Sequence, residues 1–350
     1  MKFEGSSKVL GTALDAGFFS AVSAEVGSLN GPAWKYARGR LSFEPEARAV
    51  GVATIFDLAS LTKVLATTTL AVRLVAAGRL GLGAQVGSLV SGWSGSTRSA
   101  VAVRDLLEHC SGLPAHRRYF EELAGRSEYE RAIAAEPLEY HPRQASIYSD
   151  LGFMLLGFIL EDAGGSALNL QFREWCDRVG ISEPIDFLPP PEWHPRIPST
   201  SRDRWHNGAL IGEVQDENAA ALGGVAAHAG LFGTAGAVGQ IARWWLARLT
   251  GVEQSDDAAV AREFAIRSTV PGSSRAMGWD TMLATSSCGR RLSPTAIGHT
   301  GFTGTSLWID PTYDLYAVLL TNFVLRSTDR EKIRQIRRSF HDAVVADFVR

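Results

Sequence analysis

Residues 298–323 read GHTGFTGTSLWIDPTYDLYAVLLTNF and contain two strand-like runs, at 305–309 and 315–323. The turn signal Asp310-Pro311-Thr312-Tyr313 joins them, so the stretch predicts an antiparallel hairpin. Residues 329–350 follow with apolar side chains at helical spacing beside a strongly basic face. This pattern predicts a helix that packs on the sheet containing the hairpin.

The beginning of the chain carries a matching pattern. Residues 18–26 and 34–41 are strand-like and flank a loop with Asn30-Gly31-Pro32, which predicts a second hairpin. The residues before this hairpin predict an amphipathic helix. The sequence therefore predicts an α+β fold of the kind in which one antiparallel sheet is built from both ends of the chain and flanked by the two terminal helices.

The middle of the chain alternates helical stretches with Pro- and Gly-rich loops such as LPPPEWHPRIPST. The helical stretches lie at 101–108, 151–163 and 237–249. We expect a helical domain with active-site loops over residues 86–284, inserted into a sheet domain formed by residues 1–85 and 285–350.

Composition limits the classes of function. The chain has 350 residues, of which 45% are hydrophobic and 21% charged, and this is typical of a globular protein rather than of a disordered or fibrous one. The formal net charge of −2 gives no long-range attraction for nucleic acid or anionic lipid. We expect no nucleic-acid partner, and the sequence makes no prediction of oligomeric state.

Location is predicted from the N-terminus and the cysteines. Asp15 interrupts the first apolar stretch, and no later window approaches the roughly 18 uninterrupted apolar residues of a membrane span. Cys110, Cys176 and Cys288 are widely separated and form no CxxC pair, so we interpret them as buried thiols in a reducing compartment. These patterns predict a cytoplasmic protein without a membrane partner.

Ser60-Leu61-Thr62-Lys63 is an S-x-x-K tetrad at the start of a segment, 61–80, whose spacing predicts a largely buried helix. A step of three residues places Ser60 and Lys63 on one helix face. The helix N-terminus favours an oxyanion, and desolvation is expected to lower the pKa of Lys63 toward the range of a base. The alternative is that Ser60 is a helix cap and Lys63 a surface residue, and the tetrad alone leaves both open.

Two further motifs follow in order: Tyr148-Ser149-Asp150 and His299-Thr300-Gly301. Taken singly, Tyr148 is better explained as a buried aromatic anchor and His299 as a satisfied strand histidine. Together with FDLASLTK at 56–63, LLEHCSGLP at 106–114 and GHTGFTGTSLWIDP at 298–311, the three motifs resemble the class C β-lactamase and penicillin-binding protein superfamily. This superfamily includes D-alanyl-D-alanine peptidases, family VIII carboxylesterases and acyltransferases, and the resemblance covers about residues 20–325.

The resemblance implies a β-lactamase/transpeptidase-like fold and a role for each matched residue. Ser60 is the implied nucleophile, and Lys63 and Tyr148 share the duties of base and acid. The oxyanion hole would use the backbone N–H groups of Ser60 and Phe302. The positions implied to bind the substrate are Asp150, His299, Thr300, Gly301 and Phe302.

Two departures from the superfamily pattern bear on the substrate. Asp150 stands where Asn is usual, and an ionised carboxylate accepts hydrogen bonds but donates none. His299 stands where Lys is usual and is mostly neutral near pH 7, although some peptidases of the superfamily also carry His there. Both changes favour neutral esters over carboxylate-bearing β-lactams.

We therefore expect a serine hydrolase that acts on a small-molecule ester or amide, most simply by hydrolysing carboxylic esters or transferring their acyl groups. The alternatives are a β-lactamase or a D-alanyl-D-alanine carboxypeptidase or D-aminopeptidase, and, from another class, a non-catalytic ligand-binding relative.

A Gly/Ala-rich stretch at 208–232, GALIGEVQDENAAALGGVAAHAGLF, resembles a loop near the active-site rim of many superfamily members. Its alternative explanation is close packing of small residues with solvated carboxylates. Neither an H-E-x-x-H motif nor a G-x-S-x-G elbow is present, so we expect no metal, no cofactor and no α/β-hydrolase fold.

Overall fold

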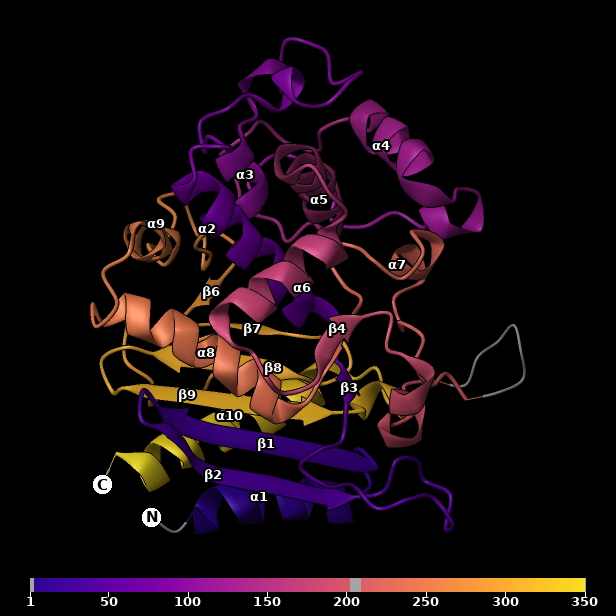
Figure 1. Ribbon diagram of the computed structural model, residues 1–350, viewed down its shortest axis with the longest axis vertical. Coiled ribbons are helices and arrows are strands. Elements are labelled where there is room, and N and C mark those ends of the chain that lie inside the picture. The colour runs from indigo at the N-terminus through magenta and orange to yellow at the C-terminus, as the bar shows by residue number, and fades with distance from the viewer. Residues whose placement is uncertain (1–2, 202–208, 350) are drawn as a thin grey trace.

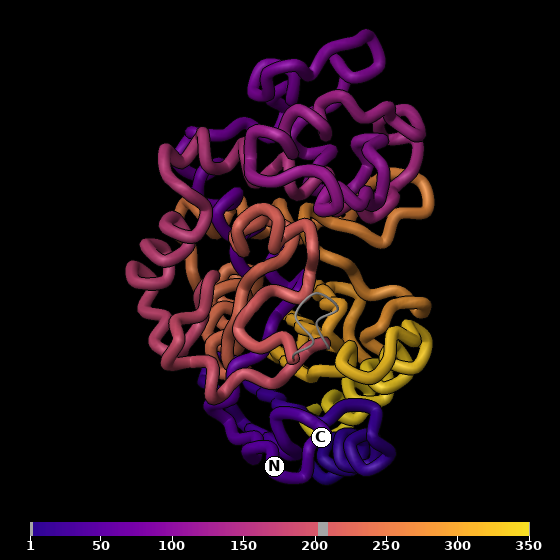
Figure 2. Tube along the Cα trace, turned by 90° about the vertical axis from the view of Figure 1, so that its right-hand side faces the viewer, coloured from indigo at the N-terminus to yellow at the C-terminus, as the bar shows by residue number. Residues whose placement is uncertain are grey.

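The computed structural model describes residues 3–201 and 209–349. The sheet and its covering helices lie at one end of the molecule and most of the other helices at the opposite end (Figures 1 and 2). The α-helices in the described residues are α1 (Glu4–Asp15), α2 (Thr68–Ala76), α3 (Val103–Leu107), α4 (Gly125–Ala135), α5 (Asp150–Gly164), α6 (Leu168–Val179), α7 (Glu217–Ala221), α8 (Ala235–Leu249), α9 (Asp256–Phe264) and α10 (Arg330–Phe348). The strands are β1 (Ala21–Ser28), β2 (Gly31–Gly39), β3 (Phe56–Asp57), β4 (Ile185–Phe187), β5 (Leu231–Gly233), β6 (Asp280–Thr281), β7 (Ile297–Thr300), β8 (Ser306–Asp310) and β9 (Leu315–Thr321).

The main sheet is antiparallel and has six strands in the order β2-β1-β9-β8-β7-β6. Strand β1 from the early chain pairs with β9 from the late chain, with Ala24 opposite Leu319. Both predicted hairpins are present, and the prediction that the two ends of the chain share one sheet is confirmed.

Strand β9 is buried on both faces. Leu315, Ala317 and Leu319 pack in the cluster formed with α1 and α10, whereas the alternate residues, Tyr316 among them, pack in the larger cluster that includes α8. The terminal helices α1 and α10 lie side by side on one face of the sheet, and α8 covers the other (Figure 1). A strand between two covered faces needs apolar side chains at every position, which explains the nearly continuous apolar run at 315–323.

The division of the chain at residues 85 and 285 stays a prediction. Edge strand β6 and helix α8 both come from the middle of the sequence, and both associate with the main sheet. A smaller sheet, in the order β3-β5-β4, was not predicted. Its strands have two or three residues each, too few to show a period of two.

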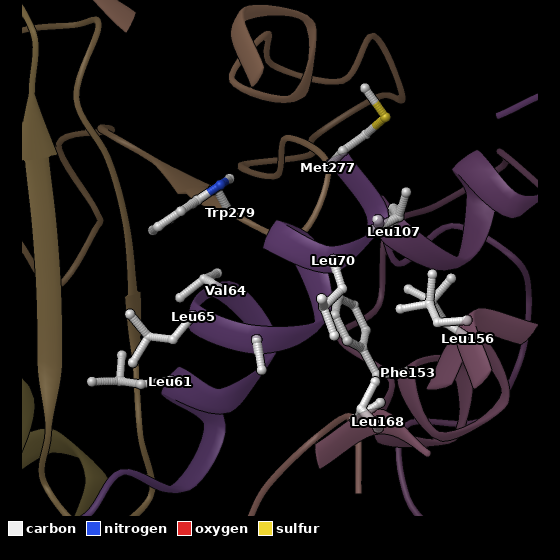
Figure 3. Packing of buried hydrophobic residues seen from close by; sticks show 14 of the residues in the cluster. Leu61, Val64, Leu65, Leu70, Leu107, Phe153, Leu156, Leu168, Met277 and Trp279 are labelled. Atoms are coloured by element: carbon white, nitrogen blue, oxygen red, sulfur yellow. The ribbon is translucent and has the colours of Figure 1, made fainter. Parts of the chain in front are cut away.

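The segment after Ser60 runs through the core of the helical region. Leu65, Leu70, Phe153 and Trp279 belong to one buried cluster there (Figure 3). By composition alone Ala59–Ala76 has the length and hydropathy of a membrane-crossing helix, but 78% of this window is buried inside the protein. Such burial is typical of a core helix.

The predicted helix at 61–80 is less regular than expected. It begins with a 3₁₀ turn at Ala59–Leu61, continues as a π-helical turn at Lys63–Thr67 and becomes α-helical only at α2. Thr68 Oγ1 donates to the Lys63 carbonyl at 2.7 Å and Thr69 Oγ1 to the Val64 carbonyl at 3.1 Å. Hydroxyl groups that take up main-chain carbonyls compete with the regular helical bonds and widen the turn.

Candidate active site

Ser60 lies in the 3₁₀ turn directly after β3, and its side chain is half-buried. The preceding residue, Ala59, has φ of +48°, a left-handed conformation that is costly for a residue with a Cβ. The Ala59 N–H donates to Asp57 Oδ1 at 2.8 Å, which holds this turn in place. The nucleophile candidate is therefore presented by a strained and anchored backbone.

Asp57 is a buried carboxylate behind this turn. Its second oxygen, Oδ2, accepts a hydrogen bond from the Gln215 N–H at 2.8 Å. Burial raises the pKa of Asp57 to about 6, even though both hydrogen bonds favour the ionised form. Sequence reasoning did not assign Asp57 a role, although its place just before Ser60 in FDLASLTK is typical of an aspartate that caps a turn.

The three predicted catalytic side chains meet at one point. Lys63 Nζ donates to Ser60 Oγ at 3.1 Å, and Tyr148 Oη donates to the same oxygen at 2.9 Å. Lys63 is fully buried and also donates to the His228 carbonyl at 2.9 Å. A hydroxyl within hydrogen-bond reach of two proton-carrying groups has the geometry required of a serine nucleophile.

The charge state of Lys63 differs from the expected one. Burial opposes its charged form, as predicted, but Asp150 Oδ1 lies 2.7 Å from Lys63 Nζ. The attraction of Asp150, with a smaller contribution from Tyr148, outweighs burial and raises the pKa of Lys63 above its ordinary value. The expectation of a lowered lysine pKa was wrong because the sequence did not reveal that Asp150 pairs with Lys63.

Tyr148 is held between aromatic rings. Its ring centroid lies 4.6 Å from that of His109 and 5.9 Å from that of His299. Burial raises the pKa of Tyr148, and the nearby Lys63 charge offsets this only in part. At neutral pH the site therefore holds a lysine cation and a neutral phenol, so one of these groups must release a proton before it accepts the proton of Ser60.

Both histidines beside Tyr148 are neutral. Burial, followed by the positive charges of Arg275 and Lys63, holds the pKa of His109 and of His299 well below the usual range. His299 Nδ1 lies 2.9 Å from the Thr300 carbonyl. His299 therefore supplies no fixed positive charge.

The turn between β7 and β8 lies against the Ser60 turn. Thr303 Oγ1 donates to the Asp57 carbonyl at 2.9 Å and Thr305 Oγ1 donates to the Leu58 carbonyl at 3.1 Å. These bonds bring His299, Thr300, Gly301 and Phe302, at the end of β7 and in the turn, to the side of Ser60. The backbone N–H of Phe302 has no acceptor in residues 3–201 and 209–349.

Arg275 is a second residue that sequence reasoning missed. Its guanidinium carbon lies 5.2 Å from the centroid of the Tyr148 ring, and the side chain is half-buried. No acidic side chain forms an ion pair with Arg275 within the described parts of the chain. Nothing in the local sequence marks it, because it lies in a loop between α9 and β6.

The Gly/Ala-rich stretch passes behind Lys63. Its first residue, Gly208, lies outside the described residues. His228 Nε2 lies 2.9 Å from Asp216 Oδ1, while the His228 carbonyl receives the bond from Lys63. Asn218 is buried and accepts from Tyr129 Oη at 2.9 Å. Small residues allow this close approach, since a Cβ on Gly157 would lie 2.5 Å from Ala227.

A metal site needs several ligand side chains around one point. Over residues 3–201 and 209–349, no three His, Cys, Asp or Glu side chains are arranged to hold a metal ion. The three cysteines are buried and free.

Known proteins resemble this chain in sequence and in fold. The family model described as Beta-lactamase matches residues 32–340. A protein of Escherichia coli (strain K12) named "Putative D-alanyl-D-alanine carboxypeptidase" is 30% identical over an alignment of 326 residues, gaps included, and the match covers 83% of this chain and 74% of that protein.

Two solved structures show the same fold. EstCE1, described as a hydrolase with promiscuous acyltransferase activity, has a TM-score of 0.76 at 19% identity, with 97% of each chain covered. A class C β-lactamase from Rhodobacter sphaeroides has a TM-score of 0.76 at 16% identity, with 99% of each chain covered.

Proposed function

The chain belongs to the β-lactamase family, and from that premise we propose that it forms an acyl-enzyme on Ser60 and acts on small carboxylic esters, by hydrolysis or by acyl transfer. The observation that carries the proposal is the convergence of Lys63 Nζ and Tyr148 Oη on Ser60 Oγ, at 3.1 and 2.9 Å. This geometry also argues against a non-catalytic relative, in which nothing would maintain the three groups together.

The proposed reaction has two acyl-transfer steps. The reaction begins once the Lys63 and Tyr148 pair has lost one proton to solvent. Ser60 Oγ then attacks the substrate carbonyl, and its proton passes to the pair. The negative charge that develops on the carbonyl oxygen is stabilised by the backbone N–H groups of Ser60 and Phe302. The pair returns the proton to the leaving alkoxide as the bond between that oxygen and the carbonyl carbon breaks. Water or an acceptor alcohol then attacks the acyl-enzyme carbonyl and gives its proton to the pair, and the pair passes this proton to Ser60 Oγ as the ester bond to Ser60 breaks.

The preference for esters rests on the polar groups around the nucleophile. Asp150 pairs with Lys63 and offers no donor for an acylamino carbonyl, and His299 is neutral. Two apolar side chains lie close to these residues in sequence: Ile147, three residues before Asp150, is 40% exposed, and Phe302, three residues after His299, is 44% exposed. The similarity of the fold to that of EstCE1 shows that this architecture accommodates a hydrolase with acyltransferase activity.

A D-alanyl-D-alanine carboxypeptidase is the second candidate, and Arg275 is the observation that favours it. A carboxypeptidase binds a substrate that ends in a carboxylate, and a guanidinium is suited to bind a carboxylate through two hydrogen bonds. Arg275 lies over the Tyr148 ring without an acidic partner in the described residues. The relative from E. coli carries this activity in its name.

One preparation assayed with nitrophenyl esters, nitrocefin and D-alanyl dipeptides distinguishes the candidates. We expect the ratio kcat/KM to be highest for short-chain esters, because this ratio reports transition-state binding. A fluorophosphonate probe should label the wild-type protein and fail to label Ser60→Ala. Labelling of Ser60→Ala at the wild-type rate would place the nucleophile elsewhere, and no labelling of either protein would support the non-catalytic alternative.

We further propose a cytoplasmic location, supported by the three free cysteines, which are buried and suit a reducing compartment. Fractionation of the host cell tests this, and recovery in the periplasmic fraction would contradict it.

A further inference from the structure

Arg337 is a buried cation on α10. Its side chain is 7% exposed, and in the described part of the chain it forms no ion pair with a carboxylate. Burial lowers the pKa of Arg337 to about 9, and no neighbouring charge compensates. A buried guanidinium without a counter-charge lowers the stability of the folded protein. The groups that Arg337 contacts therefore indicate what role it has.

Those groups are two backbone carbonyls of the turn beside Ser60. Arg337 Nη2 donates to the Gly301 carbonyl at 2.6 Å and to the Thr305 carbonyl at 2.9 Å. The same turn is closed by the Gly301 N–H, which donates to the Thr305 carbonyl at 2.8 Å, and by the Gly304 N–H, which donates to the Gly301 carbonyl at 3.1 Å. Arg337 therefore adds a second hydrogen bond to each of two carbonyls that already accept one within the turn.

The Gly301 carbonyl belongs to the same peptide group as the Phe302 N–H. The peptide group is planar and trans, since the described residues contain no cis bond, so its C=O and N–H point in opposite directions. Arg337 draws the carbonyl toward α10, which turns the N–H away from α10. This N–H is left without an acceptor among the described residues.

The other side of Gly301 faces the nucleophile turn. A Cβ at Gly301 would lie 2.7 Å from the Leu58 carbonyl oxygen and 3.2 Å from Ala59 Cβ, so the two turns are in direct contact. The peptide that Arg337 holds is thus wedged between α10 and the residues just before Ser60.

We propose that Arg337 is a positioning residue that fixes the Gly301–Phe302 peptide with its N–H toward the oxyanion of the substrate. The inference rests on the proposed acyl-enzyme function. Arg337 acts through the peptide and does not touch the substrate. Its positive charge also polarises the carbonyl to which it donates, and this strengthens the N–H at the other end of the same peptide as a donor.

The size of the effect follows from what one oxyanion-hole donor contributes. Loss of such a donor lowers kcat by about 10²- to 10³-fold. Because the Gly304 N–H still binds the Gly301 carbonyl, Arg337→Met should leave the peptide only partly misoriented and lower kcat by about 10- to 100-fold. KM for a nitrophenyl ester should change little, since the oxyanion forms only in the transition state.

Three variants test the proposal. Arg337→Met keeps much of the length of the side chain without charge or donors, whereas Arg337→Lys keeps the charge and N–H donors on a shorter side chain and should restore part of kcat. The matched control is His341→Gln. His341 is buried one turn along α10 and its Nε2 bonds Ser306 Oγ at 3.0 Å, a side chain and not the backbone of the turn. The His341→Gln substitution should change thermal stability but not kcat of the folded enzyme.

The measurement pairs steady-state kinetics with inhibition by a boronic acid, whose tetrahedral adduct places an oxygen in the oxyanion hole. In Arg337→Met the boronic acid should lose affinity in parallel with kcat while KM stays the same. A loss of kcat no larger than that of His341→Gln, or unchanged boronic-acid affinity, would overturn the proposal. If Arg337→Met does not fold, Arg337→Lys against His341→Gln gives the same comparison. Fluorophosphonate labelling of the wild type tests the acyl-enzyme separately.

Discussion

Lys63 Nζ lies 2.7 Å from Asp150 Oδ1 and 3.1 Å from Ser60 Oγ, so the buried ammonium is bound more closely to a carboxylate than to the nucleophile. The resting site stores its proton on Lys63. Asp150, which was expected to contact the substrate, thus forms an ion pair with Lys63 and stabilises its charged form.

Replacement of Asp150 by Asn should shift the pH profile of ester hydrolysis. Asp150 raises the pKa of Lys63, so its removal lowers that pKa, and the unprotonated lysine then appears at lower pH. The limb of kcat/KM that rises with pH should move to lower pH, as measured with a nitrophenyl ester between pH 5 and 10. An unmoved limb would mean that the titration of Lys63 does not limit the reaction.

The same variant tests the ester preference. Asn donates a hydrogen bond where Asp150 cannot, so the ratio of kcat/KM for short-chain esters to that for nitrocefin should fall in Asp150→Asn. Thermal denaturation serves as the control, because Lys63 loses its counter-charge. If the ratio is unchanged, the hydrogen-bond argument for ester preference has to be abandoned.

Loss of either proton-carrying group should slow turnover without unfolding the protein. Tyr148→Phe keeps the ring that packs on His109 and removes the hydroxyl that bonds Ser60 Oγ and interacts with Lys63. We expect Tyr148→Phe and Lys63→Ala to lower kcat by at least about 100-fold, the usual contribution of a general base. Steady-state assays with melting curves check this, and near-normal turnover in Tyr148→Phe would leave Lys63 as the sole base.

Asp57 should make stability depend on pH. Its pKa is about 6 in the folded protein against 3.8 for the free side chain, so the folded state binds the proton more tightly. The contribution of Asp57 to the free energy of unfolding is therefore fully present below about pH 4 and is lost as pH rises through 6. For a pKa shift of about two units this is a change of about 3 kcal/mol in that free energy. Asp57→Asn removes this dependence, so the melting temperature of the variant should rise relative to wild type between pH 4 and 7. A constant difference between the two proteins would contradict the raised pKa.

Arg275 should matter only for substrates that end in a carboxylate. We expect Arg275→Gln to lower kcat/KM for D-alanyl dipeptides by about 10- to 100-fold, as for loss of a charge-assisted hydrogen bond of about 1.5 to 3 kcal/mol. Nitrophenyl acetate, which has no carboxylate, is the matched substrate and should be hydrolysed at nearly the wild-type rate. Equal losses on both substrates would assign Arg275 to the support of Tyr148 instead.

Gly301→Ala should separate the two turns of the site. The added Cβ would lie 2.2 Å from Thr305 Oγ1 and 2.7 Å from the Leu58 carbonyl oxygen, and a main-chain atom cannot yield cheaply. We expect a fall in kcat of about 10²-fold or more, the scale of a lost oxyanion donor. Gly51→Ala is the control, since its Cβ would meet nothing within 4 Å. Full activity in Gly301→Ala would show that the turns need not touch.

Patterns within single elements predicted most of the fold and part of the site. Turn signals and strand-like runs gave the hairpins, apolar spacing gave α10, which buries one face, and a long apolar run gave α5, which is buried on all sides. Ser60, Lys63 and Tyr148 were predicted from motifs and do converge on one atom. Arg275 and Arg337 were missed because their roles come from contacts between residues far apart in the sequence. Asp57 was missed although its bond to the Ala59 N–H is local. The π-helical turn after Ser60 coincides with bonds from two threonine hydroxyls to main-chain carbonyls, and apolar spacing carries no signal for such bonds.

The pairing of β1 with β9 has a consequence for biosynthesis. Strand β1 leaves the ribosome early, but its partner is translated nearly 300 residues later, on the order of tens of seconds at typical elongation rates. During that interval one edge of the nascent hairpin is apolar and unpaired, a state prone to aggregation. Helix α10, which follows β9 in the sequence, covers one face of the sheet and carries Arg337. A ribosome-bound chain stalled before α10 should therefore contain Ser60, Lys63 and Tyr148 and still lack esterase activity.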